Sequence, residues 1–148
     1  MHLEFERLVR EFFQSVSFNA GAKPHYEHLR ELFIPEGKLI RNNLAAPEIA
    51  GIDQFIAPRQ KTVDAGELTA FQEVECAAIT EVFGNIAHRL TTYKKWGTLH
   101  GQAFEGRGVI STQFIHTPAG WRISSMAWDD ERPGVPLPER YQPVSVTS

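Results

Sequence analysis

The sequence predicts one α+β domain, in which a curved antiparallel sheet wraps around N-terminal helices and forms a cone with a pocket. Apolar residues recur at helical spacing over the first third of the chain. From residue 67 onward Thr, Val, Ile and aromatic residues dominate, and glycine-containing turns interrupt them. Helices that come first and strands that follow as consecutive hairpins are typical of this fold class, because the helices then cover one face of the sheet.

The first half of the chain predicts helices with a short strand among them. The predicted elements are a helix over residues 3–17, a helix after Pro24, a turn at residues 35–37, a strand over residues 38–41 and a helix from Asp53 to Gly66. An acidic N-cap and a terminal glycine are common helix boundaries, and they define the third helix. We expect the apolar faces of these helices to pack on the sheet.

The second half predicts four long strands in two hairpins. The predicted strands cover residues 68–83, 86–96, 109–116 and 121–129. Gly84-Asn85 is typical of a two-residue hairpin turn, and the three glycines of residues 97–106 predict a loop. Four prolines follow between residues 133 and 143, so we divide the chain into a domain of residues 1–132 and a Pro-rich C-terminal tail of residues 133–148.

Composition excludes several classes of protein. The chain has 148 residues, the usual size of one domain. Its net charge is −3 and its Lys and Arg residues are scattered, so it lacks the clustered basic surface that is typical of nucleic-acid-binding proteins. The apolar runs are too short for a membrane span and the N-terminus does not read as a signal peptide, so we expect a cytoplasmic protein. The single cysteine, Cys76, is expected to be a buried thiol. No cofactor or metal is expected, because His25 and His28 have no third ligand nearby in the sequence.

Strand alternation predicts which side chains line the pocket. Counting from the Gly84-Asn85 turn places Glu81 opposite His88 and Cys76 opposite Tyr93. Aromatic walls with a few polar groups are typical of ligand pockets. The predicted pocket residues are Tyr93, Ser111, Gln113, Met126 and Trp128, together with Arg89. The opposite face, which carries Ile110, Thr112 and Phe114, is the alternative, and a one-residue bulge would exchange the two faces.

Two further residues are weaker candidates. His88 opposite Glu81 has the geometry that orients a general base, although the same pair on an exposed face is only a surface contact. Asp129 begins the run Asp129-Asp130-Glu131, which would place a carboxylate at the mouth of the pocket or in solvent.

Several stretches resemble one superfamily. The stretches are Phe83-Gly84-Asn85-Ile86-Ala87-His88-Arg89, Thr91-Thr92-Tyr93, residues 104–108 and residues 120–131. Over nearly all of residues 3–131 the chain resembles the nuclear transport factor two-like superfamily, also called the cystatin-like cone fold, and its small bacterial SnoaL-like members, most of which have no assigned activity. The resemblance implies a cone with a pocket. It leaves the function open, since the superfamily includes ketosteroid isomerase, scytalone dehydratase, polyketide cyclases and assembly domains.

Two functions therefore stay open. The first is a pocket that binds a small, mostly apolar organic molecule, with cofactor-free proton transfer of the isomerase, dehydratase or cyclase type. The second is a non-catalytic dimeric binding or assembly module. On either view we expect a homodimer, because an uncovered sheet face exposes more apolar surface than a monomer tolerates.

Overall fold

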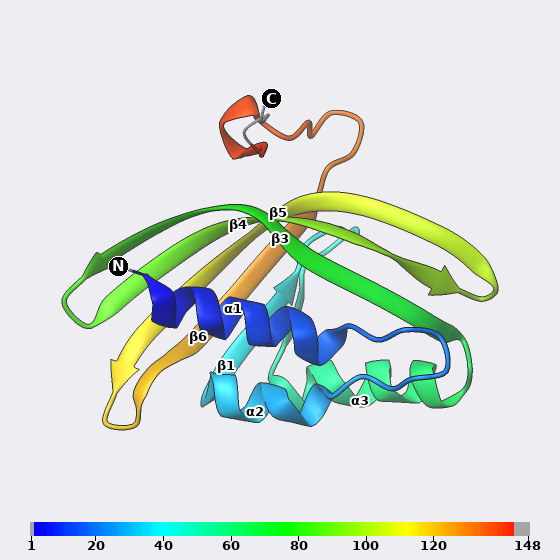
Figure 1. Cartoon of the computed structure of the whole chain (residues 1–148), viewed down its shortest axis with the longest axis horizontal. Coiled ribbons are helices and arrows are strands. Elements are labelled where there is room, and N and C mark those ends of the chain that lie inside the picture. Colours follow the sequence, from blue (N-terminus) through cyan, green and yellow to red (C-terminus); the bar gives the residue numbers. More distant parts are fainter. Residues whose placement is uncertain (1, 144–148) are drawn as a thin grey trace.

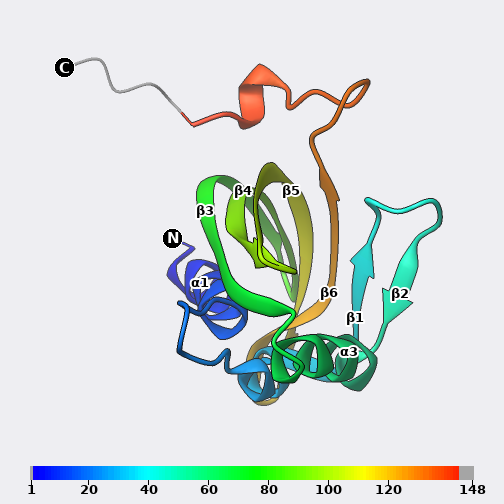
Figure 2. The ribbon, with the colours of Figure 1, turned by 90° about the vertical axis from the view of Figure 1, so that its right-hand side faces the viewer.

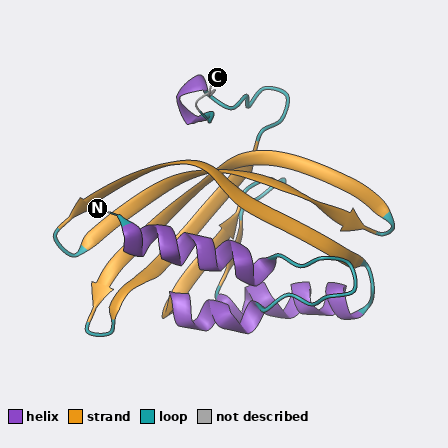
Figure 3. Cartoon of the chain, in the orientation of Figure 1, coloured by secondary structure: helices purple, strands orange, loops and turns teal. Residues whose placement is uncertain are grey.

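A computed structural model describes residues 2–143, and three helices lie under the concave face of a curved six-stranded sheet (Figure 1). The strand order is β2-β1-β6-β5-β4-β3. Neighbouring strands are antiparallel except for β1 and β6, which are parallel. The predicted α+β class, with a curved sheet around N-terminal helices, is confirmed, and Figure 3 shows all three helices on one side of the strands.

The elements have the following bounds. The helices are α1 Leu3–Val16, α2 Leu29–Leu32 and α3 Ile52–Asp64, and 3₁₀ turns cover Tyr26–His28 and Glu139–Tyr141. The strands are β1 Phe33–Arg41, β2 Glu48–Ala50, β3 Leu68–Phe83, β4 Ile86–Leu99, β5 Gln102–Thr117 and β6 Gly120–Asp130. No helix in the described part of the chain is long and apolar enough to cross a membrane.

The core lies between α1 and the concave face of the sheet. The buried residues of α1 follow the predicted helical spacing and include Phe5, Leu8, Val9, Phe12, Phe13 and Val16. They belong to one cluster with Ile110, Phe114, Ile123 and Met126 of β5 and β6. Each large apolar side chain that leaves water contributes about 1.5–3 kcal/mol, so this layer holds the helix on the sheet. Figure 2 shows the strongly curved strands around α1.

The predicted loop over residues 97–106 is wrong, because β4 continues to Leu99 and β5 starts at Gln102. The connection is a two-residue turn in which His100 and Gly101 have φ of 51° and 75°. Gly97 lies inside β4, where the Ala70 carbonyl oxygen and the Phe104 ring leave no room for a side chain. A Cβ at Gly97 would come within 2.8 Å of that ring.

The turn predicted at residues 35–37 is also wrong. These residues belong to β1, where the pairing with β6 shifts between Phe33 and Lys38. The short strand β2, which pairs with the end of β1, has no counterpart in the prediction. The second helix exists, but only as a 3₁₀ turn followed by one turn of α-helix.

Two bulges correct the predicted faces of the sheet. In β3, Glu75 lies opposite Tyr93 and Ala77 opposite Thr92, so Cys76 is the extra residue and is exposed, against our expectation of a buried thiol. In β6, Ser124 is passed over between the pairs formed by Ile123 and Ser125. A bulge turns every side chain beyond it to the other face, and both predicted registers fail at these positions.

The segment after β6 returns along the convex face of the sheet. Thr92 donates a hydrogen bond to the Tyr141 carbonyl (2.5 Å), and the backbone N–H of Leu137 donates to Glu131 (2.8 Å). Leu137 is buried there. Figure 1 shows this segment on the side of the sheet opposite the helices. The division of the chain at residue 132 stays a prediction.

Candidate functional site

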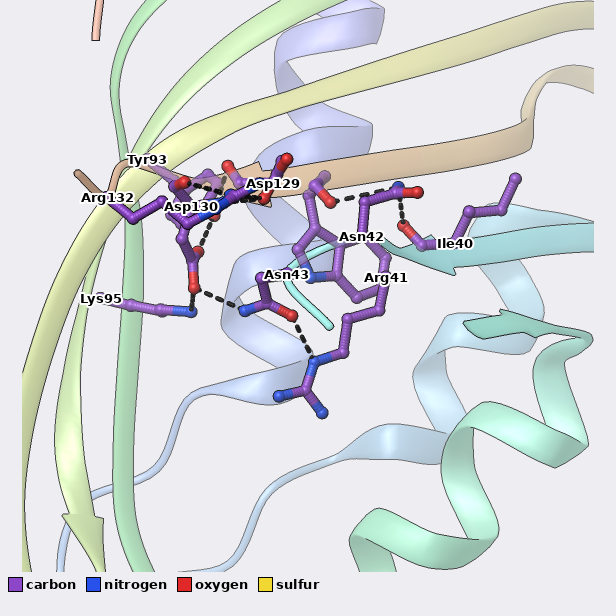
Figure 4. Close-up of polar contacts among 10 residues, drawn as sticks. Ile40, Arg41, Asn42, Asn43, Tyr93, Lys95, Asp129, Asp130 and Arg132 are labelled. Carbon is purple, nitrogen blue, oxygen red and sulfur yellow. Dashed lines mark hydrogen bonds and ion pairs between the residues drawn. The ribbon is translucent and has the colours of Figure 1, made fainter. Parts of the chain in front are cut away.

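Five polar side chains gather on the concave face near the end of β6, and we call them the Asp130 cluster. The members are Asn43, Glu73, Tyr93, Lys95 and Asp130. They come from β3, β4 and β6 and from the segment that follows β1. Figure 4 shows Asn43, Tyr93 and Lys95 converging on Asp130. Residues that are distant in the sequence thus form one polar group.

Asp130 is the centre of this cluster. Lys95 Nζ lies 2.9 and 2.8 Å from its two carboxylate oxygens, Asn43 donates to it at 2.5 Å, and the Tyr93 hydroxyl also donates to it. Burial alone would raise the pKa of Asp130, but hydrogen bonds from Lys95, Tyr93 and Asn43 outweigh it and lower that pKa. The carboxylate therefore stays ionised at neutral pH and holds its three donors in place.

Tyr93 reaches Asp130 because the strand between them carries a glycine. Gly108 of β5 lies opposite Tyr93, and a Cβ on that glycine would come within 2.4 Å of the phenol oxygen. The ring therefore crosses β5 to β6, where the hydroxyl also donates to the Asp129 carbonyl at 3.0 Å. Burial, followed by the hydrogen bond to Asp130, raises the pKa of Tyr93, so the phenol remains a proton-bearing donor.

Glu73 differs from Asp130 in its surroundings. The bulge at Cys76 turns it to the concave face, where it lies opposite Lys95. Burial raises the pKa of Glu73 to about 8, the Asp130 charge adds to the rise, and the Lys95 charge opposes it only in part. Within residues 2–143 no side chain donates a hydrogen bond to its carboxyl. The residue is half-buried, so part of it contacts solvent.

A hollow of about 450 Å³ lies between α1 and the edge strand β3. Its walls include Phe13 of α1 and both inward-turned glutamates, Glu73 and Glu75. Ligand sites are concave and combine apolar walls with a few polar groups, so this hollow gives Glu73 a route to a bound molecule.

Arg89 is buried in a second polar group. Its Nε and Nη2 pair with the Glu75 carboxylate at 3.0 and 2.5 Å, and its Nη1 donates to Thr80 at 2.6 Å. Thr91 donates to the same carboxylate at 2.8 Å. Only 5% of Arg89 is exposed. Its donors are therefore engaged inside the fold, and the group joins β3 to β4.

The structure brings together only part of the predicted pocket. Tyr93, Arg89, Met126 and Trp128 share the concave face, where Met126 is fully buried and the Trp128 ring meets the edge of Phe55. The prediction that Ser111 and Gln113 share this face is wrong. They lie opposite Leu90 and His88 on the convex face, because the bulge at Ser124 shifts the register of β6.

The side chains of the two weaker candidates do not belong to the Asp130 cluster. His88 pairs with Glu81 at 2.7 Å on the exposed face, which is the surface arrangement. Asp129 accepts hydrogen bonds from Arg132 and from the backbone N–H of Asp130. The inward carboxylate is its neighbour Asp130.

The prediction missed Asn43, Glu73 and Lys95, and it named Asp130 only as part of the run that begins at Asp129. Strand alternation could have placed Lys95 on the same face as Tyr93, since it lies two residues after Tyr93 on the same strand. In the part of the chain that is described, no three His, Cys, Asp or Glu side chains converge as a metal ion requires.

No protein-family model matches the sequence, and no curated protein matches it significantly. Solved structures match its shape. A nuclear transport factor 2-like superfamily protein from Salmonella enterica is 19% identical, with a TM-score of 0.71 over 88% of this chain and 90% of that one. A protein with a cystatin-like fold from Nostoc punctiforme is 15% identical, with a TM-score of 0.67 over 87% and 90%.

A hexachlorocyclohexane dehydrochlorinase, LinA-type3, from Novosphingobium barchaimii is also similar. It is 11% identical, with a TM-score of 0.71 over 86% of this chain and 84% of that one. Identities this low establish shape and not activity. The chain therefore has the nuclear transport factor 2-like, or cystatin-like, fold that the residues between Phe83 and Glu131 resemble.

Proposed function

We propose that this chain binds a small organic molecule beside the Asp130 cluster and that Glu73 moves a proton to or from it without a cofactor. The observation that supports this most is the state of Glu73, a half-buried carboxyl group with no hydrogen-bond donor from the described side chains and a pKa of about 8. Perturbed carboxyl groups of this kind concentrate at functional sites.

The chemistry suits an isomerase, dehydratase or cyclase step. At pH 7 a group with this pKa is ionised in about one molecule in ten, so both the acid and its conjugate base are present. A general acid–base works best when its pKa lies near the working pH. Tyr93 is fully buried and donates its hydroxyl proton to Asp130, so it holds that carboxylate in place and does not act on the ligand. The name dehydrochlorinase describes removal of hydrogen chloride, which needs a base, and this likeness of fold lends support.

Proton exchange at carbon tests the proposal without knowledge of the substrate. Carbonyl compounds with acidic α C–H bonds are incubated with the protein in D₂O, and deuterium uptake is followed by proton NMR. We expect at least one compound to exchange faster with the wild-type protein than with Glu73→Gln. Equal rates for the two proteins across the whole panel would refute a proton-transfer role for Glu73.

The convex face supports the second function, a dimeric binding or assembly module. Ile79, Phe83 and Ile86 lie together on this face around the first hairpin, with exposed fractions of 47%, 83% and 58%. Apolar side chains gathered on a sheet face favour association with another copy. Sedimentation velocity is expected to show a dimer for the wild-type protein and a monomer for Phe83→Lys. A monomeric wild-type protein would rule out the homodimer. The cytoplasmic location is a separate prediction that this experiment does not test.

A further inference from the structure

Arg59 of α3 carries a charge that the fold leaves largely unbalanced. Its guanidinium lies 3.6 Å from the centre of the Phe55 ring, and Nη1 donates to the Phe55 carbonyl at 3.1 Å. Among the described residues its nearest carboxylate is that of Glu48, at 4.0 Å, too far for a hydrogen bond. Only 24% of the side chain is exposed. Burial lowers the pKa of Arg59, the Glu48 charge opposes this fall, and the smaller effect of the Arg41 charge adds to it.

Arg41 of β1 faces the same region. In the sheet it lies opposite Glu48 of β2 on one side and Trp128 of β6 on the other. Its Nε donates to Asn43 at 2.7 Å, and Asn43 in turn donates to Asp130. Figure 4 shows this chain of contacts, with the outer end of the guanidinium directed away from the cluster. No carboxylate of residues 2–143 forms an ion pair with Arg41.

Two guanidinium groups thus share one distant carboxylate in a half-buried place. Like charges repel more strongly there than in water, and a cation without a close partner is costly to bury. Phe55 and Trp128 lie beside the pair with their rings in edge contact, 6.1 Å between centres.

We propose that Arg41 and Arg59 bind the carboxylate of a small organic acid whose body lies against Trp128. The inference rests on the proposed ligand site at the Asp130 cluster and names the class of ligand. Guanidinium groups present paired N–H donors that match a carboxylate. Glu48 leaves the pair with a net charge of about +1, which one carboxylate balances, whereas a doubly charged phosphate would also be repelled by Glu48.

Calorimetric titration tests this with phenylacetate, cyclohexanecarboxylate and acetate as probes, at constant ionic strength. Phenylacetamide is the neutral match of phenylacetate, and inorganic phosphate is the competing anion. We expect phenylacetate to bind at least tenfold more tightly than its amide and than phosphate. Loss of one charge-assisted contact is expected to weaken phenylacetate binding about tenfold or more in Arg59→Gln and Arg41→Gln. Arg140→Gln, a change in an exposed arginine far along the chain, is expected to leave it unchanged.

The outcomes separate this inference from the proposed function. Equal binding of phenylacetate and its amide, tighter binding of phosphate, or unchanged binding in Arg59→Gln would each overturn it, as would the absence of binding by all three carboxylates. Carboxylate binding that persists without any Glu73-dependent proton exchange would sustain the inference and refute the catalytic role.

Discussion

Ionisation of Glu73 is expected to destabilise the folded protein as the pH rises. In the unfolded chain this carboxyl group loses its proton near its usual pKa of 4.5, but in the folded protein it does so only near 8. Between these values the folded state binds more protons than the unfolded state. Stability is therefore fully present below about pH 4.5 and is lost progressively as the pH rises to about 8.

The size of the effect follows from the two pKa values. A rise from 4.5 to about 8 corresponds to at most about 4.8 kcal/mol, at 1.36 kcal/mol for each pKa unit. Because Glu73 keeps some contact with solvent, we expect about 2–4 kcal/mol. Glu73→Gln removes the ionisable group and keeps the shape of the side chain. Its unfolding free energy is therefore expected to lack this loss with rising pH and to exceed that of the wild-type protein at pH 8.5.

Urea denaturation at intervals from pH 5 to pH 8.5 measures this difference. Histidines and other carboxyl groups titrate in both proteins, so they cancel when the two curves are subtracted. Glu105→Gln, an exposed glutamate on β5, is the matched control and is expected to change little. The reasoning would be refuted if the difference in unfolding free energy between the wild-type protein and Glu73→Gln changed by less than 0.5 kcal/mol across this pH range.

Three further changes test the packing that positions the site. Gly108→Ala is expected to cost about 1–3 kcal/mol in thermal denaturation, because the added methyl group meets the Asp129 carbonyl and the Tyr93 hydroxyl; an unchanged melting temperature would contradict these contacts. Arg89→Leu strands the Glu75 carboxylate inside the sheet and is expected to cost about 3–5 kcal/mol in urea denaturation, whereas a cost below 1 kcal/mol would show that Glu75 finds water. Deletion of Cys76 removes the bulge and turns Glu73 outward, so the pH dependence assigned to that residue is expected to vanish; its persistence would mean that the strand re-forms the bulge elsewhere.

The helices and hairpins followed from local patterns in the sequence. The apolar spacing of α1 and the Gly84-Asn85 turn are properties of neighbouring residues, and both predictions match the structure. The strand that passes through Gly97 did not follow, because that glycine is explained by contacts with both neighbouring strands, the Ala70 carbonyl and the Phe104 ring. Local sequence thus determines the elements, and long-range contacts determine how far they extend.

The candidate site was predictable only in part, because the position of a bulge depends on how the whole strand pairs in the sheet and not on the neighbouring residues alone. Tyr93 was placed correctly by alternation, and Lys95 on the same strand was within reach of the same rule. Glu73 was not, since it faces inward only because Cys76 is passed over in the pairing. Asn43 and Arg59 come from segments whose positions depend on how α3 and β2 pack, which no pattern along the strands reveals.

Mapping of small-fragment binding by two-dimensional NMR tests the central claim most directly, because it needs no knowledge of the natural ligand. A library that includes organic acids is screened, and shifts of backbone amide signals locate each fragment. We predict that hits concentrate on the amides of Arg41, Asn43, Glu73, Lys95 and Asp130, and that acids are enriched among them. Hits that avoid these residues and gather on the convex face would contradict it, and a dimeric binding module would then be the better explanation.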